Sequence, residues 1–321
     1  MTLENLETLH EPVLLERTLE LLGPALSSES AVLLDCTLGL GGHTQAFLEK
    51  FPKLRVVGID RDEKALELAG KRLAAFGERV KYFHGTYDQI AMALAQHNLS
   101  EVQAILMDLG VSSMQIDNAD RGFAYSFDAP LDMRMDTSAG STAEQLLTSL
   151  SQKELTRIFK EYGEERFAAK IADRIVSARS ISPLSTSNQL AALVGEVVPF
   201  IPGKSSGHPA KRVFQALRIA VNRELEILEN AMPAAISALS VGGRLLVLSY
   251  HSLEDRIVKQ ALVKASTSSA PLDLPFELPE HAPVLKLIVK GAEKANFQEI
   301  ANNPRSASVR LRAAEKIRKV A

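Results

Sequence analysis

The sequence of 321 residues predicts an α/β fold, in which a parallel sheet has helices on both faces. Three observations support this prediction. Short apolar runs alternate with helical patterns over the first hundred residues, and a glycine-rich turn, Gly39–Gly42, follows the first run. A carboxylate, Asp60, ends the second run. This combination is typical of sheets that bind a nucleotide-like ligand at the carboxyl ends of their strands.

The first part of the chain is predicted to form four strand–helix units. Asp62 is expected to cap the helix that follows the second strand, because a side-chain carboxylate at that position accepts a backbone N–H. The expected strands are Ala31–Cys36, Leu54–Asp60, Val80–His84 and Val102–Asp108, and the expected helices are Val13–Leu26, Thr44–Phe51, Asp62–Phe76 and Gln89–His97.

After Asp108 the alternation stops, and helical patterns follow one another without an intervening strand. Residues Gly110–Gly140 hold many turn formers, and two Ser-x-x-Glu patterns then predict helix starts by the capping-box arrangement. These patterns are Ser141–Glu144 and Ser151–Glu154, the later helices are expected at Glu164–Ala178 and Thr186–Val197, and Pro199–Pro209 is interpreted as a linker.

The sheet pattern is expected to resume in the last third of the chain. The predicted elements are a long helix at Ala210–Glu229, a strand at Gly243–Ser249, a helix at Leu253–Ala265 and a final strand pair at Val284–Val289 and Ser308–Arg312. We therefore expect a discontinuous α/β domain of residues 1–115 and 210–321. An inserted helical domain, 116–209, would lie over the crevice at the strand ends and recognise a substrate.

Composition excludes several classes of protein. The net charge is -2, the hydrophobic share is 46%, and the single cysteine, Cys36, rules out a disulfide framework or a cysteine-based zinc cluster. The acidic N-terminus has no apolar core, and no run approaches the roughly 18 residues of a membrane span. We expect a cytoplasmic protein without a membrane partner. Basic residues are concentrated in two stretches, Lys204–Arg218 and Arg305–Lys319. Each is interpreted either as a solvated face or as a phosphate-binding surface.

The glycine-rich loop leaves NAD, FAD and S-adenosylmethionine open as ligands. A dinucleotide fingerprint starting at Gly39 requires glycine at position 44, where Thr44 stands. Asp35, four residues before Gly39, suits a ligand with a charged amino-acid end, which favours the methyl donor. Tyr87 is expected to pack on an adenine face or to be a half-buried residue at a helix start. Asp108 is expected to contact ligands or to cap its strand.

The chain resembles, from end to end, the MraW/RsmH family of ribosomal small-subunit RNA cytosine-N4 methyltransferases. The strings around Leu131 and at His251 are the most specific signals. The matching segments are His10–Leu15, Gly39–His43, Asp108–Ser113, Arg121–Phe123, Pro130–Asp136, Gly163–Phe167, Phe214–Ile219, His251–Arg256 and Asn303–Ser306.

This resemblance implies a class I, Rossmann-like methyltransferase sheet with an inserted all-helical domain. It also implies S-adenosylmethionine as donor, and N4 of one cytidine in the decoding region of 16S rRNA in the small ribosomal subunit as acceptor. The family often has phenylalanine where this chain has Tyr87, so the ring is kept and the hydroxyl is new. The implied cofactor contacts are Gly41, Gly42, His43, Asp60, Tyr87, Asp108 and Gln115.

No residue is assigned to hold or deprotonate the acceptor amine. Many exocyclic-amine methyltransferases have an Asp/Asn-Pro-Pro-aromatic motif after the fourth strand, where this chain has Asp108-Leu109-Gly110-Val111. His43 is interpreted as a cofactor contact or a helix cap. His251, with Glu254 and Asp255 nearby, is interpreted as a cap rather than a metal site, so we expect no metal requirement.

Three aromatic residues near the start of the insert, Phe123, Tyr125 and Phe127, are candidates for base stacking or for the core of the insert. Two other functions stay open from the residues alone. One is an NAD-dependent dehydrogenase that uses the same crevice. The other is a ribosome-assembly factor that binds the methyl donor without using it.

Overall fold

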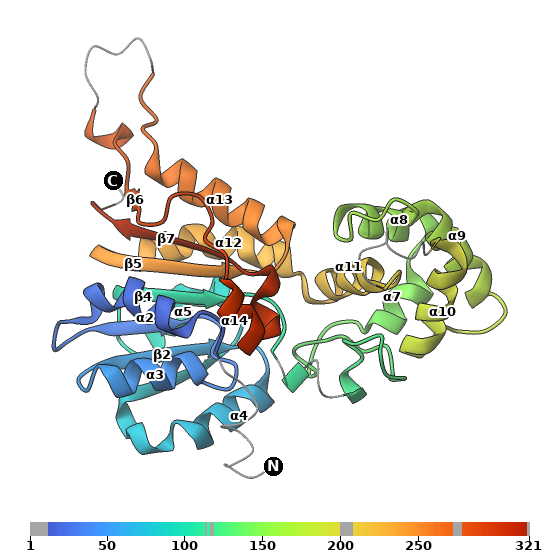
Figure 1. The fold of residues 1–321 in the computed structure, drawn as a ribbon, viewed down its shortest axis with the longest axis horizontal. Helices are drawn as coiled ribbons and strands as arrows, with labels where there is room; N and C mark the ends of the chain where they lie inside the picture. Colours follow the sequence, from blue (N-terminus) through green and yellow to red (C-terminus); the bar gives the residue numbers. More distant parts are fainter. Residues whose placement is uncertain (1–11, 113, 116–118, 200–207, 272–277, 320–321) are drawn as a thin grey trace. The chain divides into compact units, whose positions relative to one another are not determined.

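The structure is a computed structural model that describes residues 12–112, 114–115, 119–199, 208–271 and 278–319. Its internal contacts divide the chain into two units, residues 1–110 with 225–321 and residues 111–224 (Figure 1). The first unit carries a seven-stranded sheet with helices. The described part of the second unit consists of helices and turns, with one isolated bridge between Pro130 and Thr186. The predicted α/β sheet with an inserted helical segment is confirmed.

The strands of the first unit lie in the order β3-β2-β1-β4-β5-β7-β6. The first five strands along the chain are parallel, and β7 runs antiparallel between β5 and β6. Because the order reverses between β1 and β4, the crevice for a ligand is expected at their carboxyl ends. The bounds are β1 Val32–Asp35, β2 Arg55–Asp60, β3 Val80–His84, β4 Val102–Asp108, β5 Leu239–Ser249, β6 Leu285–Leu287 and β7 Arg310–Lys316.

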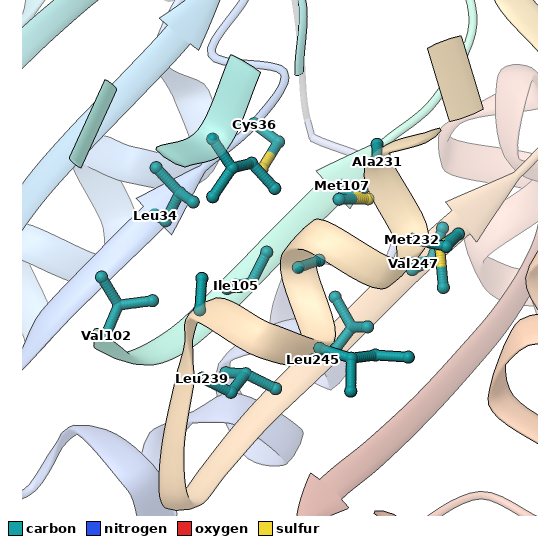
Figure 2. Close-up of a cluster of buried hydrophobic side chains, with 14 of the residues drawn as sticks. Leu34, Cys36, Val102, Ile105, Met107, Ala231, Met232, Leu239, Leu245 and Val247 are labelled. Atoms are coloured by element: carbon teal, nitrogen blue, oxygen red, sulfur yellow. The ribbon is translucent and has the colours of Figure 1, made fainter. Parts of the chain in front are cut away.

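The central strands are buried on both faces, as their continuous apolar runs predict. Alternate residues of β4 enter two separate cores: Ile105 and Met107 face one, and Ala104 and Leu106 the other. Figure 2 shows Met107 in the first core with Ala231 and Met232, which come from the helix α12 (Glu224–Ala238). Cys36 lies in the same core, and burial raises the pKa of its thiol well above the ordinary value. A thiol with so high a pKa stays protonated near neutral pH and is unreactive.

Two groups of helices cover the two faces of the sheet. The first core is closed by α5, α12 and α13, and the second by α2, α3 and α4. The predicted cap of α4 is confirmed, because the Asp62 side chain accepts from the Lys64 N–H. The bounds are α2 Leu15–Leu22, α3 Gly42–Lys50, α4 Glu63–Arg72, α5 Ile90–Gln96, α13 Ser252–Ser266 and α14 Phe297–Asn302.

The second unit has its own apolar core, in which Phe159, Ile171 and Leu190 are fully buried. The capping box at Ser151 and Glu154 is confirmed. The one expected at Ser141 is wrong by one residue, because Thr142 caps the helix with Gln145. Most of the expected linker, residues 200–207, lies outside the described residues. The helices are α7 Ala143–Ser149, α8 Gln152–Glu161, α9 Ala168–Arg179, α10 Ser187–Val197 and α11 Lys211–Asn222.

The long helix expected at Ala210–Glu229 is wrong, since the structure has two helices there. Helix α11 ends at Arg223, which has a left-handed backbone with φ +51°, and α12 begins at Glu224. The apolar periodicity continues across this break and no glycine or proline marks it, so Asn222 is the one weak stop signal that the sequence carries there. Contacts group α11 with residues 111–224, although the insert expected from the sequence ends at residue 209.

Candidate functional site

The loop between β1 and α3 forms the tight turn that its glycines predict. Gly39 and Gly41 have left-handed backbones with φ +53° and +77°. A Cβ atom on Gly41 would lie 2.9 Å from Leu73 Cδ1, and one on Gly42 would lie 2.8 Å from Pro12 Cγ. A side chain at either position would crowd Leu73 or Pro12, and at Gly41 the left-handed backbone also favours glycine.

Asp35 is the last residue of β1, and its side chain stabilises this loop by hydrogen bonds. Its carboxylate accepts hydrogen bonds from Thr44 Oγ1 at 2.7 Å and from the Thr37 N–H at 3.2 Å. The side chain is 1% exposed, and this burial raises the pKa of Asp35 above its ordinary value. Its place before the glycines predicts a charged ligand for this acid, but the hydrogen bonds of the Asp35 side chain are with the loop itself.

Asp60 ends β2 beside the same loop. Its Oδ2 accepts from the Gly39 N–H at 2.7 Å, and its Oδ1 accepts from the Asp62 N–H at 2.9 Å. Burial raises the pKa of Asp60 to about 6, against the lowering effect of these two hydrogen bonds. The carboxylate is thus fixed in one orientation, and each oxygen has a further lone pair for a ligand hydroxyl.

Asp108 ends β4 and is held by three neighbours. Its backbone N–H donates to Thr37 Oγ1 at 2.7 Å, and its Oδ1 accepts from the Tyr250 hydroxyl at 2.6 Å. Its Oδ2 lies 3.6 Å from Nε2 of His43. His43 is 7% exposed, and neither of its ring nitrogens has a hydrogen-bond partner among the described residues. The crevice edge therefore brings an acid, an imidazole and the glycine-rich turn together.

The two other predicted site residues, Tyr87 and Gln115, have different surroundings. Tyr87 begins a short 3₁₀ turn after β3, is half-buried, and packs against the core that contains Met107. Gln115 belongs to the second unit, where its buried side chain accepts from the Ser112 N–H at 3.1 Å. The structure thus collects Gly41, Gly42, His43, Asp60 and Asp108 around one turn at the carboxyl edge of the sheet.

Three residues that shape this edge were not identified from the sequence: Thr37, Thr44 and Tyr250. The two threonines flank the glycine-rich turn, where a hydroxyl close to Asp35 in the sequence was the available signal. Tyr250 had no such signal. It meets Asp108 only because Leu248 of β5 is in register with Asp108 of β4, and this pairing joins residues 140 or more positions apart.

His251 caps α13, as the sequence predicts. Its Nδ1 accepts from the Glu254 N–H at 3.4 Å, while Glu254 accepts from the Tyr250 N–H at 2.8 Å. Asp255, one residue further on, pairs with Arg312 at 2.7 Å and with Arg310 at 3.0 Å. Two arginines of the C-terminal basic stretch are therefore paired with Asp255, although 40% of the Arg310 side chain stays exposed.

The three aromatic candidates of the second unit differ in exposure. Tyr125 stacks on His208, with ring centroids 4.7 Å apart, and meets the edge of Phe214 at 5.7 Å. Phe123 packs against the core of the unit. Phe127 is 57% exposed. Of these three rings, Phe127 alone has the exposure that stacking on a base requires.

Comparisons with known proteins agree over nearly the whole chain. A family model described as the MraW methylase family matches residues 7–317. Ribosomal RNA small subunit methyltransferase H from Clavibacter michiganensis subsp. michiganensis is 58% identical over 314 residues, which cover 98% of each chain. The protein of the same name from Nocardia farcinica is 57% identical over 311 residues, 96% of each.

A solved structure of an rRNA methylase from Streptococcus thermophilus aligns with 95% of the chain and 94% of its own, at 12% identity and a TM-score of 0.39. This likeness is too weak to add to the comparison. Among the described residues, no helix has the length and apolar content needed to cross a bilayer.

Proposed function

The chain belongs to the MraW methylase family, and on this premise we propose that it methylates a cytidine of 16S rRNA. The methyl group comes from S-adenosylmethionine, and the acceptor is the exocyclic N4 in the decoding region of the small ribosomal subunit. The relatives' names support a small-subunit RNA substrate. N4 and the decoding region follow from the family resemblance. Such a substrate places the reaction in the cytoplasm.

One observation supports the donor site most strongly: the fixed carboxylate of Asp60 beside the glycine-rich turn. A ribose presents two neighbouring hydroxyls, and Asp60 has a free lone pair on each oxygen, with its orientation set by the Gly39 N–H. Gly41, Gly42 and His43 then contact the donor at the start of α3. The Tyr87 ring packs on the adenine, and Asp108 and Gln115 complete the contacts.

The residues present fit this donor chemically. The imidazole of His43 is buried with both nitrogens unused by the described residues, so it has hydrogen-bonding capacity for a bound group. The donor supplies an electrophilic methyl group on a sulfonium, and transfer is a single in-line displacement. Much of the acceleration therefore comes from positioning donor and acceptor against each other.

The unit of residues 111–224 is proposed to recognise the RNA. Reading one cytidine of a folded RNA requires the base to leave its stack, and an exposed aromatic ring stabilises such a base or its neighbour. Phe127 offers this ring. Hydrogen bonds with Ser187 hold its backbone in place. The Ser187 hydroxyl donates to the Phe127 carbonyl and accepts from the Ala129 N–H, and the Ser187 N–H donates to the Ala129 carbonyl.

The deciding experiment is methyl transfer from labelled S-adenosylmethionine to small subunits that lack the modification, followed by nucleoside analysis. Label in N4-methylcytidine is the expected result. Label in a different nucleoside would overturn the acceptor assignment. Tight donor binding without label in RNA would instead favour an assembly factor, and binding of NADH in place of S-adenosylhomocysteine would favour a dehydrogenase.

A further inference from the structure

Tyr250 makes a hydrogen bond to the proposed donor site from a neighbouring strand. It follows the end of β5, and its hydroxyl donates to Asp108 Oδ1 at 2.6 Å. Burial, and next the charge of Asp108, raise the pKa of Tyr250 well above its ordinary value. The hydroxyl therefore keeps its proton near neutral pH and acts as a donor to the carboxylate.

Tyr250 itself is fixed in three ways. Its backbone N–H donates to Glu254 at the start of α13, at 2.8 Å. Its ring packs against the core that contains Leu106 and Leu248. Its Cδ2 lies 3.6 Å from the position that a Cβ on Gly110 would take, so the turn after β4 passes close to the ring. A hydroxyl held in this way constrains the group that it contacts.

Among the described residues, Tyr250 is the one that donates a hydrogen bond to the carboxylate of Asp108. The terminal torsion of an aspartate side chain has a broad, nearly two-fold energy profile, so its two oxygens exchange places at little cost. The backbone of Asp108 is fixed by Thr37, but that contact leaves the torsion open. The Tyr250 hydroxyl occupies Oδ1, and Oδ2 is then the oxygen on the His43 side, 3.6 Å from Nε2.

We propose that Tyr250 is a positioning residue, which holds the Asp108 carboxylate so that Oδ2 is presented to the methyl donor beside His43. This inference rests on the proposed function, because it needs the donor to contact Asp108. Tyr250 touches neither donor nor acceptor in this role. Its effect on the reaction passes entirely through Asp108.

The test removes the hydroxyl and keeps the ring, as in Tyr250→Phe. We expect the dissociation constant for S-adenosylhomocysteine and the KM for the donor to rise about tenfold, the scale of one hydrogen bond to a charged group. The kcat at saturating donor is expected to change less than about twofold, since the donor, once bound, fixes Asp108 itself. Thermal unfolding of the variant shows whether the fold is kept.

Tyr82→Phe is the matched control. Tyr82 is a half-buried tyrosine of β3 that packs against the same core, and its hydroxyl has no hydrogen bond to the described residues. Burial alone raises the pKa of Tyr82. Its loss should leave donor affinity at the wild-type value, so any difference between the two variants measures the contact with Asp108.

A double-mutant cycle separates positioning from a general structural role. In the background of Asp108→Ala, Tyr250→Phe should cause no further loss of donor affinity. An equal loss in both backgrounds would overturn the inference, and so would wild-type affinity of Tyr250→Phe. If the wild-type protein bound no S-adenosylhomocysteine, the proposed function itself would fail, which is a separate and recognisable result.

Discussion

Asp60→Asn is the substitution that tests the donor site most sharply. The carboxylate is proposed to accept two ribose hydroxyls, and an asparagine at this position keeps one oxygen and replaces the other by an NH₂ group. A hydrogen bond to a charged acceptor contributes about 1.5–3 kcal/mol, so donor affinity should fall about 10- to 150-fold.

The same substitution should leave the stability of the unliganded protein nearly unchanged, because two effects oppose each other. The folded-state pKa of Asp60 is raised from 3.8 to about 6, so the folded protein binds its proton more tightly than the unfolded chain. The sign of the linkage means that stability falls as pH rises from about 4 to 6, by about 3 kcal/mol in all. The neutral amide of the variant would avoid this cost. It would also set an NH₂ group against one backbone N–H, which costs about 1–3 kcal/mol.

Calorimetric titration with S-adenosylhomocysteine and thermal unfolding at pH 7 would measure the two quantities on one sample. Wild-type donor affinity should also fall about tenfold from pH 7 to pH 5, because a carboxyl group with a pKa near 6 goes from about nine-tenths to about one-tenth ionised. Asp62→Asn is the control, since asparagine caps a helix as well as aspartate. Donor affinity of Asp60→Asn within threefold of wild type would refute the assignment of Asp60 to the ribose.

Three further substitutions test the rest of the description. Gly41→Ala should destabilise by about 1–2 kcal/mol in thermal unfolding, because of its φ of +77° and the contact with Leu73, whereas Gly70→Ala, with open space around it, should not destabilise. Asp255→Asn should destabilise by about 2–3 kcal/mol in urea at pH 7. The arginine hydrogen bonds lower the pKa of Asp255 despite its burial, so this contribution is present above about pH 4 and is lost as pH falls below it, and wild type and variant should converge there. Phe127→Ala should raise the KM for small subunits about tenfold and leave S-adenosylhomocysteine affinity and the thermal midpoint at wild-type values, since the ring is 57% exposed.

The sequence predicts the parallel strands well because burial on both faces leaves a simple pattern. The expected and observed bounds coincide for β4, a mostly apolar and buried run that stops at Asp108, and also for β3, which includes Lys81 and is only partly buried. The lateral order of the strands is not encoded in such runs. That β7 lies antiparallel between β5 and β6 follows from pairing between distant segments, which a single sequence does not display.

The end of a helix was harder to predict where the backbone leaves the helical conformation at a residue that is neither glycine nor proline. Arg223 adopts a left-handed conformation that is more usual for glycine or asparagine, and Arg218 pairs with Glu224 across the break at 2.9 Å. Both the helical periodicity and the charge pattern are compatible with one continuous helix. Tertiary contacts therefore decide the end of α11, and with it the limit between the two units.

The site residues that the sequence predicts differ from those that only the structure reveals. The two acids proposed to contact a ligand, Asp60 and Asp108, are the last residues of their strands, so they are recognisable from where an apolar run ends. The groups that fix such acids come from neighbouring segments: Gly39 for Asp60, and Tyr250 for Asp108. A parallel sheet places these partners at one edge only after its strands are aligned. Donor affinity should therefore depend on the partners as well as on the acids, because a carboxylate contributes its full binding energy only when its oxygens are already in place.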